Sequence, residues 1–450
     1  MHIKQFEDKN LAHYSYAIIS DCEKKIILID PARNLQQYID FAKENKAEII
    51  GVIETHPHAD FVSSHLELHE TLGATIYASK LAGALYPHQT FDEGQTLQVG
   101  KIKLSALNTP GHSPDSISIV LEHNGKQKAV FTGDTLFIGD CGRPDLRESV
   151  GKIQTTRVEL AKQMYHSLRD KLMPLPNDVL VYPAHGAGTL CGKNLSKESS
   201  STIEEEKKTN WSLQKNTEEE FMRILLADQP FVPLYFPFDV DLNRKGATSL
   251  KESIDKIKIS NSVNEKITTG LDKTSWVIDT RREDDFKKGH LPYSINLMED
   301  GKFETWLGSI IKPGERFYLA SESKKQLKTM LQRTAAIGYE SRVAEAFVIK
   351  SGQVKEARIN LDEFKNHTED YTIIDVRNIA EVKEAKIFKN SIAIPLAEIR
   401  NRIKEIPIDK PIVVHCAGGY RSAAASSLIH SKLYDKATVL DLGEAIKQFL

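Results

Sequence analysis

The sequence predicts a multidomain α/β protein, with a β-rich domain over residues 1–245 and two smaller α/β domains over 246–352 and 353–450. Two observations lead to this division. A chain of 450 residues has room for three domains of ~150 residues each. In addition, the segment 277–281 (VIDTR) resembles the segment 373–377 (IIDVR), so a unit of roughly 100 residues is repeated in the second half.

In the first domain, apolar runs end repeatedly in a histidine or an aspartate. Such runs, and the alternating pattern at 102–107, are typical of buried or half-buried strands. Because functional side chains are commonly carried on loops at strand ends, we expect these residues to converge at one edge of a β-sandwich. The pairs are 49–53 with His56, 102–107 with His112, 129–133 with Asp134, and 178–183 with His185.

The rest of the first domain is predicted to be more helical. Residues 64–70 follow the first histidine and read as a helix, and 218–226 read as another. The Ser-, Glu- and Lys-rich stretch 196–208 indicates an exposed loop leading into a solvated helix. The Pro- and aromatic-rich segment 230–237 is expected to pack back on this domain.

Each repeat in the second half begins with an apolar strand followed by acid-rich helical sequence. A further apolar strand follows about forty residues later, at 317–320 and at 411–415. Strands that alternate with helices imply a parallel sheet covered by helices. We therefore expect two domains with parallel sheets.

Composition excludes several classes of function. The net charge is -2 and the pI about 6.7, which does not suggest a nucleic-acid or membrane surface. The N-terminus is polar and acidic where a signal peptide would be apolar, and no apolar run approaches the ~18 residues that span a bilayer. Four cysteines do not make a disulfide scaffold. We expect a cytoplasmic protein and a homo-oligomer.

The strongest metal-site candidates are His56, His112 and Asp134. Two imidazoles and one carboxylate that leave positions open form the facial triad suited to Fe(II) and O2 chemistry. The run 55–61 (THPHADF) resembles the H-x-H-x-D-H pattern of the metallo-β-lactamase superfamily, with Phe61 in place of the last His. In dinuclear members that His helps to hold the second metal, so the sequence predicts one iron per chain.

Two further segments sharpen this resemblance. Residues 133–146 (GDTLFIGDCGRPDL) and 182–186 (YPAHG) resemble the persulfide dioxygenases of that superfamily. The resemblance implies an αββα sandwich and an iron held by the three residues named above. It implies a low-molecular-weight thiol persulfide and O2 as substrates, with thiol and sulfite as products. It also implies supporting roles, in orienting ligands or moving protons, for His58, Asp60 and His185.

Two residues of this domain have alternative interpretations. Arg143 either positions an anionic substrate or forms a structural pair with Asp145. Cys191 lies shortly after His185, where Gly192 and Lys193 are expected to expose it and favour its thiolate, so it is a candidate for handling persulfide sulfur.

The segment 415–422 (HCAGGYRS) lies between an apolar strand and a good helix. Glycines there allow backbone N–H groups to point at one centre, and the helix N-terminus adds positive potential that stabilises a persulfide anion. The arrangement resembles the active loop of rhodanese sulfurtransferases, with Cys416 as nucleophile and Arg421 at the rim. The remaining members of the predicted persulfide nest are Ala417, Gly418, Gly419, Tyr420 and Ser422.

The middle domain has a rhodanese-like opening at 278–281 and 289–292. At its expected active loop, 320–325 (ASESKK), no cysteine occurs and a glutamate stands where glycines would be needed. We therefore predict an inactive copy that serves as spacer, interface or docking surface.

These features together favour a persulfide dioxygenase fused to two rhodanese-like domains of three-layer α/β architecture. Sulfite formed at iron would receive sulfur from a Cys416 persulfide and give thiosulfate. One alternative is a glyoxalase II-like thioester hydrolase with a rhodanese appendage, which would need two metals. The other is a sulfur-binding sensor or scaffold, which oxygen uptake with a persulfide would exclude.

Overall fold

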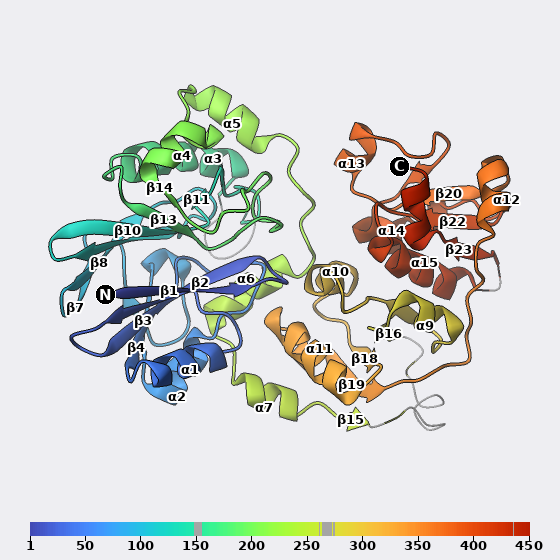
Figure 1. Cartoon of the computed structure of the whole chain (residues 1–450), viewed down its shortest axis with the longest axis horizontal. Coiled ribbons are helices and arrows are strands. Elements are labelled where there is room, and N and C mark those ends of the chain that lie inside the picture. Colours follow the sequence, from blue (N-terminus) through green and yellow to red (C-terminus); the bar gives the residue numbers. More distant parts are fainter. Residues whose placement is uncertain (148–154, 261, 263–271, 273–274, 435) are drawn as a thin grey trace. The chain divides into compact units, whose positions relative to one another are not determined.

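The structure is a computed structural model that describes residues 1–450 except 148–154, 261, 263–271, 273–274 and 435 (Figure 1). Its contacts divide the chain into two compact units. The first contains Met1–Glu252 and Ala336–Gly338, and the second contains Ser253–Ala335 and Tyr339–Leu450. Among the described residues, no helix is both long enough and apolar enough to cross a bilayer.

The first unit is built on two six-stranded sheets. In one sheet β1 to β3 pair antiparallel and β3 to β6 pair parallel, in the order β1-β2-β3-β4-β5-β6. These strands are β1 (His2–Asp8), β2 (His13–Ser20), β3 (Lys25–Ile29), β4 (Glu48–Ile53), β5 (Thr75–Ala78) and β6 (Gln89–Thr90). The other sheet, in spatial order, consists of β14 (Ser201–Thr202), β13 (Leu180–Pro183), β10 (Lys126–Gly133), β9 (Ile117–His123), β8 (Ile102–Asn108) and β7 (Thr96–Val99).

Three apolar cores give this unit four layers. One core lies between the sheets, with side chains such as Ile53 from the first and Leu104 from the second. A second core joins helices α1 (Gln36–Glu44) and α2 (His65–Leu72) to the first sheet. A third joins α3 (Arg157–His166) and α5 (Glu218–Leu226) to the second sheet (Figure 1). The order helix, sheet, sheet, helix confirms the predicted αββα sandwich.

Local sequence explains how these elements form. Strand β8 alternates buried and partly buried residues, as the period-two pattern predicts. Helix α5 has the predicted bounds and begins with a capping box between Thr217 and Glu220. The remaining described elements of the unit are α4 (Ile203–Thr209), α6 (Phe236–Lys245), the hairpin β11 (Leu136–Phe137) with β12 (Asp140–Cys141), the 3₁₀ helices η1 (Lys80–Ala82) and η3 (Trp211–Leu213), and the π-helix η2 (Ser167–Leu172). Helix α7 (Leu250–Asp255) begins in the first unit and ends in the second.

The second unit contains two sheets, of five and four strands, that are parallel throughout, as predicted. In spatial order the first consists of β15 (Ile259–Ser260), β19 (Val343–Val348), β18 (Phe317–Ser321), β16 (Trp276–Asp279) and β17 (Ser294–Asn296). The second consists of β21 (Ile392–Ala393), β20 (Thr372–Asp375), β22 (Ile412–His415) and β23 (Val439–Asp441). Strands β16 to β19 therefore correspond in order to β20 to β23.

The repeat extends to individual contacts. Arg281 donates from Nη2 to Asp279 at 2.6 Å and to the Gly289 carbonyl at 2.9 Å. Arg377 makes the same two bonds, to Asp375 at 2.6 Å and to the carbonyl eight residues on, of Ala385, at 2.9 Å. The helices and 3₁₀ turns are α9 (Glu283–Lys288), α10 (Phe303–Ile310), α11 (Lys324–Ala336), η4 (Glu340–Arg342), α12 (Leu361–Asn366), η5 (Thr368–Asp370), α13 (Ile379–Glu384), η6 (Leu396–Glu398), α14 (Ile399–Arg402), η7 (Ile403–Glu405), α15 (Tyr420–Leu433) and η8 (Gly443–Gln448).

Candidate functional site

The predicted ligands His56, His112 and Asp134 lie together, just beyond the ends of β4, β8 and β10. Asp134 Oδ2 lies 3.9 Å from His56 Nε2 and 3.5 Å from His112 Nε2. All three side chains are buried. Strand ends from both sheets thus bring one donor atom of each residue to a common point.

Hydrogen bonds on the far side of each imidazole set which nitrogen faces this point. The Arg143 carbonyl accepts from His112 Nδ1 at 2.9 Å, which leaves a lone pair on Nε2. The Thr55 hydroxyl donates to Asp30 at 2.8 Å and lies 3.1 Å from His56 Nδ1, so it accepts the proton of that nitrogen. Both Nε2 atoms are therefore in the state that a metal requires.

The charges of the cluster also fit a divalent metal. Burial lowers the pKa of His56 and of His112, so both rings are neutral. Burial would raise the pKa of Asp134, but His185 holds it well below its usual range. His56 Nε2 and Asp134 Oδ2 are buried without a hydrogen-bond partner. An unsatisfied buried polar group costs about 1–3 kcal/mol, which ligation would remove. The residues present therefore fit one metal with a two-histidine, one-carboxylate set.

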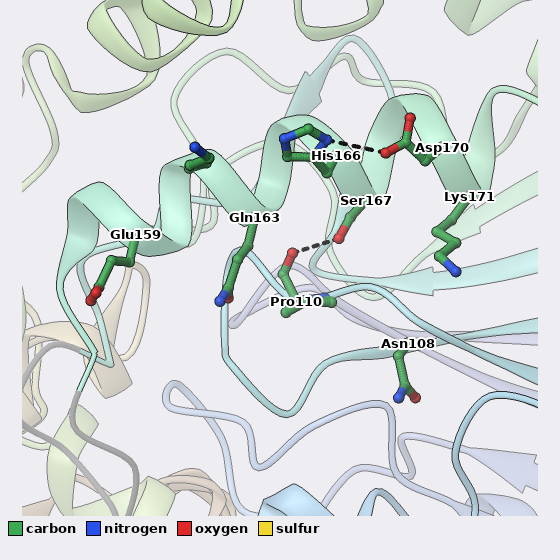
Figure 2. Close-up of a pocket in the computed structure, with 9 residues that line it drawn as sticks. Asn108, Pro110, Glu159, Gln163, His166, Ser167, Asp170 and Lys171 are labelled. Atoms are coloured by element: carbon green, nitrogen blue, oxygen red, sulfur yellow. Dashed lines mark hydrogen bonds and ion pairs between the residues drawn. The ribbon is translucent and has the colours of Figure 1, made fainter.

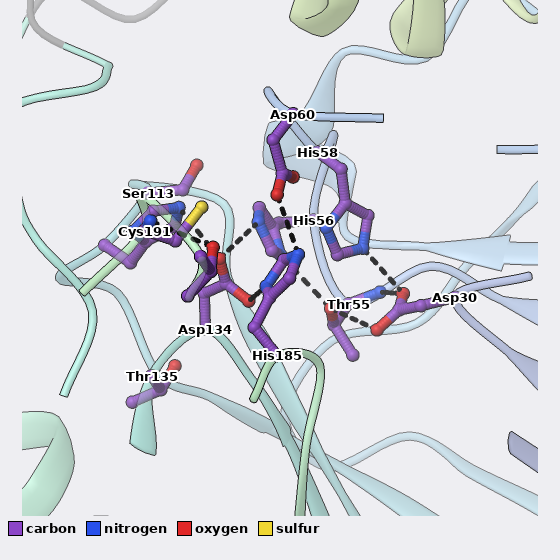
Figure 3. Close-up of polar contacts among 12 residues, drawn as sticks. Asp30, Thr55, His56, His58, Asp60, Ser113, Asp134, Thr135, His185 and Cys191 are labelled. Carbon is purple, nitrogen blue, oxygen red and sulfur yellow. Dashed lines mark hydrogen bonds and ion pairs between the residues drawn. The ribbon is translucent and has the colours of Figure 1, made fainter. Parts of the chain in front are cut away.

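His185 lies between two carboxylates (Figure 3). Its Nδ1 is 2.8 Å from Asp134 Oδ1, and its Nε2 is 2.9 Å from Asp60 Oδ2. Burial alone would lower the pKa of His185, but Asp134 and Asp60 raise it well above its usual value. The two carboxylates thus favour the protonated ring, whose Nδ1–H donates to Asp134 Oδ1.

Phe61 is packed among histidines beside this pair. Its ring centroid lies 3.7 Å from that of His13 and 4.3 Å from that of His58. His58 Nε2 in turn lies 3.2 Å from Asp30 Oδ1 (Figure 3). His58, Asp60 and His185 each bring one donor atom within 4.8 Å of the others. The geometry thus gathers a second group of ligating side chains, to which Phe61 contributes no donor.

Two glycines allow the ligand loops to approach their supports closely. A Cβ on Gly111 would lie 2.6 Å from the Met164 backbone in α3, and one on Gly142 would lie 2.0 Å from the Asp134 carbonyl oxygen. The loop before His112 is also held by the Ser167 hydroxyl, which donates to the Pro110 carbonyl at 2.6 Å. That bond lies at a separate pocket of about 490 Å³ (Figure 2), which contains none of the predicted ligands.

Arg143 is completely enclosed. Its guanidinium makes two bonds to Asp145, of 2.7 and 2.6 Å, and others to the carbonyls of Leu190 and Pro230. Only 1% of the residue is exposed. The pair with Asp145 is therefore present in the structure, and a role in positioning substrate stays a prediction.

The expected exposure of Cys191 is wrong. Cys191 is 1% exposed, and its donor atom lies within 4.8 Å of those of Asp134 and His185. Burial, with Asp60 and Asp134 nearby, raises the pKa of this thiol well above its usual value. Lys193, expected to favour the thiolate, instead donates to the carbonyl of Leu225 at 3.3 Å. Cys191 reaches the metal cavity, but as a neutral thiol.

Sequence reasoning missed the side chains that hold the ligands in place. Asp30 accepts from the backbone and the hydroxyl of Thr55 at 2.7 and 2.8 Å. Asp30 directly follows β3, so the same strand-end signal could have identified it. Arg147 forms a buried pair with Asp115 at 2.9 Å, and no local sequence signal links these two residues.

The Cys416 loop connects β22 to α15. Gly419, at φ +102°, donates its backbone N–H to Cys416 Sγ over 3.1 Å. Arg421 is paired through both terminal nitrogens with Glu381, at 2.6 and 2.8 Å. A cavity of about 390 Å³ lies at the loop. It is lined by Arg282, Glu283, Asp284, Met298, Asp300, Gly418, Gly419, Tyr420 and Glu444.

The corresponding connection in the middle domain is shorter. Only Glu322 and Ser323 separate β18 from α11, whereas four residues separate β22 from α15. The middle domain instead contacts the Cys416 loop of the C-terminal domain: the Tyr420 hydroxyl donates to the Met298 carbonyl at 3.1 Å. A Cβ on Gly301 would lie 2.4 Å from the Tyr420 ring.

Comparison with known proteins gives matches to both halves of the chain. Residues 9–185 match the Metallo-beta-lactamase superfamily, and residues 262–352 and 360–445 each match the Rhodanese-like domain. Persulfide dioxygenase ETHE1, mitochondrial, from Bos taurus is 30% identical over 224 residues, which are 49% of this chain and 79% of that protein. A probable hydroxyacylglutathione hydrolase of Schizosaccharomyces pombe is 30% identical over 38% of this chain and 63% of that protein. The crystal structure of a metallo-beta-lactamase from Staphylococcus aureus subsp. aureus COL is 30% identical, with a TM-score of 0.68 over 77% of this chain and 98% of that chain.

Proposed function

The chain belongs to the persulfide dioxygenase branch of the metallo-β-lactamase superfamily, with two rhodanese-like domains appended, and we propose that it oxidises low-molecular-weight thiol persulfides. One persulfide, one O2 and one water would give one thiol and one sulfite, with the outer sulfur oxidised and O2 reduced. The observation that carries this proposal is the convergence of His56 Nε2, His112 Nε2 and Asp134 Oδ2 on one point.

These three residues would hold one Fe(II) per chain. When bound, iron would supply the redox chemistry that lets O2 react with the persulfide sulfur, at positions that the protein leaves open. The hydrogen bonds that His56 donates to Thr55 and His112 donates to the Arg143 carbonyl fix the imidazole orientations beforehand. A preorganised site of this kind loses little free energy to rearrangement during the reaction.

The residues around the metal site would control protons. Nδ1 of His185 donates to Asp134, and its Nε2 lies 2.9 Å from Asp60 Oδ2, so the ring anchors the ligand carboxylate and the two carboxylates favour a proton on it. Cys191, buried as a thiol, would shape the cavity without acting as a nucleophile at neutral pH. Four free cysteines among the described residues are compatible with a reducing cytoplasm as the site of action.

The C-terminal domain would carry sulfane sulfur on Cys416. The Gly419 N–H that reaches Sγ supports a bound anion there, and the Arg421–Glu381 pair fixes the rim of the loop. Sulfite attacks the outer sulfur of the Cys416 persulfide, the S–S bond breaks, and thiosulfate leaves while the thiolate is regenerated. Joining the two activities in one chain raises the effective concentration of sulfite near the second centre.

A thioester hydrolase is the second candidate. It is favoured by the additional group His58, Asp60 and His185, and by the relative from Schizosaccharomyces pombe. Hydrolysis of that kind needs a second metal, and the apolar Phe61, which packs on His58 and offers no donor atom, weakens such a site.

The test is an oxygen-electrode assay of the iron-loaded full chain with glutathione persulfide and with a glutathione thioester. We expect oxygen uptake with the persulfide, one sulfite or thiosulfate formed per O2, and no thioester cleavage above the uncatalysed rate. Thioester cleavage without oxygen uptake would overturn the proposal and favour the hydrolase.

A further inference from the structure

A second cluster of potential ligands lies in the second unit, between its two rhodanese-like domains. His290 follows α9, Glu356 lies in the segment that joins the two domains, and His430 belongs to α15. One donor atom from each lies within 4.8 Å of the others. Both histidines line a cavity of about 370 Å³. None of these residues belongs to the proposed iron site or to the Cys416 loop.

The side chains of His290 and Glu356 face each other without a hydrogen bond. His290 is 1% exposed, and its Nδ1 donates to the Leu291 carbonyl at 2.8 Å, so the lone pair is on Nε2. That Nε2 lies 3.6 Å from Glu356 Oε1, and both atoms are buried without a hydrogen-bond partner. Burial, with Asp441 nearby, raises the pKa of Glu356 to about 8, so near neutral pH this carboxyl holds a proton that a bound cation would displace. The geometry leaves both atoms without a hydrogen bond, which a cation between them would remedy.

Backbone contacts hold the three segments in place. His290 and Val354 exchange two backbone hydrogen bonds of 2.9 and 3.0 Å, and the Glu356 N–H donates to the Lys287 carbonyl at 3.1 Å. The His290 ring stacks on Phe286 with centroids 4.0 Å apart and planes 4° apart. These contacts fix His290 and Glu356 before any ligand arrives.

Helix α15 is tied to the same region. The Ser431 hydroxyl donates to the Ser294 carbonyl at 3.1 Å, and the Ser427 hydroxyl accepts from the Asn296 N–H at 2.9 Å. His430 is therefore presented from a helix that is anchored on the middle domain. Because His430 is only partly buried, it opens the cluster toward the cavity.

We propose that His290, Glu356 and His430 form a binding site for a divalent transition metal of the Zn²⁺ class. Two imidazoles and one carboxylate are a common zinc set, and the cavity leaves a fourth position for water or a small ligand. A metal there joins the middle domain to the helix that begins at the Cys416 loop, so it stabilises the contact between the two rhodanese-like domains.

The test uses Co²⁺ as a visible probe in the full chain. To remove the N-terminal ligand groups, His58→Ala, His112→Ala and Asp134→Ala are combined in one background, and Cys416→Ser is added to remove the loop thiolate. Equilibrium dialysis should then find one Co²⁺ per chain, with visible d–d bands that Zn²⁺ removes by competition. His290→Ala in this background should weaken Co²⁺ binding at least tenfold and abolish the bands.

His367→Ala is the matched control, because the His367 side chain is 58% exposed and lies outside the cluster. It should bind Co²⁺ as the background does. His430→Ala provides a second, less buried substitution, and circular dichroism checks that each variant is folded. The proposal is overturned if the background binds no Co²⁺, or if folded His430→Ala and His290→Ala both bind it unchanged.

Discussion

His56, His112 and Asp134 are each oriented by a contact on the side away from the proposed metal. We therefore expect purified protein to hold one iron per chain, and replacement of any of the three by Ala to reduce bound iron below about a tenth of that amount. Three protein bonds hold a labile divalent ion, and two are too few. Elemental analysis after gel filtration measures the loss.

His123→Ala serves as the control for these variants, since His123 is partly buried at the end of β9 and pairs with Ile102 at the start of β8, whereas His112 lies beyond the other end of β8. It should retain its iron. Two tightly held metals per chain in the unmodified protein would contradict the single-iron account.

The replacement Phe61→His tests whether a donor at this position creates a second metal site. Phe61→His would supply the missing donor, yet it would also remove the ring that packs on His13 and His58. His185 remains bound to Asp60 and Asp134. We therefore expect some additional metal but no efficient hydrolysis of a glutathione thioester. A kcat within the ordinary enzyme range of ~1–1000 per second would show that the site has been misinterpreted.

A substitution of Arg143 can separate a structural role of this residue from a role in binding substrate. Arg143→Leu leaves the Asp145 carboxylate without its partner in a largely buried position, so we expect a loss of roughly 3 kcal/mol in unfolding free energy. Arg402→Leu removes solvent-screened surface pairs with Glu398 and Glu405, so it should change the unfolding free energy much less. Denaturant unfolding compares the two variants. A raised KM for persulfide with unchanged stability in Arg143→Leu would instead support substrate binding.

Single residues were predicted with uneven success, and the reason is physical. The strand-end signal identified the side chains that the structure gathers at the sheet edge, because strand ends and ligand types are local features. The environment of Cys191 was mispredicted because burial by the surrounding loops, which is not local, outweighs the effect of the neighbouring Lys193.

At the scale of elements, the loop between β22 and α15 depends on one backbone conformation. Gly419 has φ +102°, and a Cβ there would lie 3.1 Å from the Glu444 backbone nitrogen. We expect Gly419→Ala to cost about 1–3 kcal/mol at the loop and to lower sulfur transfer to sulfite about tenfold or more, while oxygen uptake is unchanged. A coupled assay of thiosulfate formation measures the first effect, and an oxygen electrode the second.

The neighbouring Gly418 provides a matched comparison, because a Cβ there would meet no atom within 4 Å. Gly418→Ala should keep most of the transfer activity. Equal loss in both alanine variants would argue against a specific requirement at Gly419.

Helices and strands whose sequences show a clear hydrophobic period were predictable. The alternation of β8 and the amphipathic run of α5 are visible in the sequence, and both elements form there. Short elements such as η2, a π-helical turn after α3, have no comparable signal, because their geometry follows from packing against distant segments.

In the molecule as a whole, the sequence repeat between 277–281 and 373–377 was sufficient to predict two parallel-sheet domains. The structure agrees, because the Asp–Arg pair of each repeat makes the same contacts in its own domain. The same comparison could not predict that the two copies form one compact unit. That association depends on contacts such as Tyr420 with Met298, which join residues more than a hundred positions apart and leave no periodic pattern.

We propose that two separate centres act in sequence, with iron oxidising persulfide and Cys416 converting sulfite to thiosulfate. The most direct measurement is a product analysis of Cys416→Ser supplied with glutathione persulfide and O2. Serine keeps the shape of the loop but cannot carry a persulfide. We predict unchanged oxygen uptake, accumulation of sulfite, and thiosulfate only at the uncatalysed rate. Thiosulfate formation by Cys416→Ser at the wild-type rate would contradict this account.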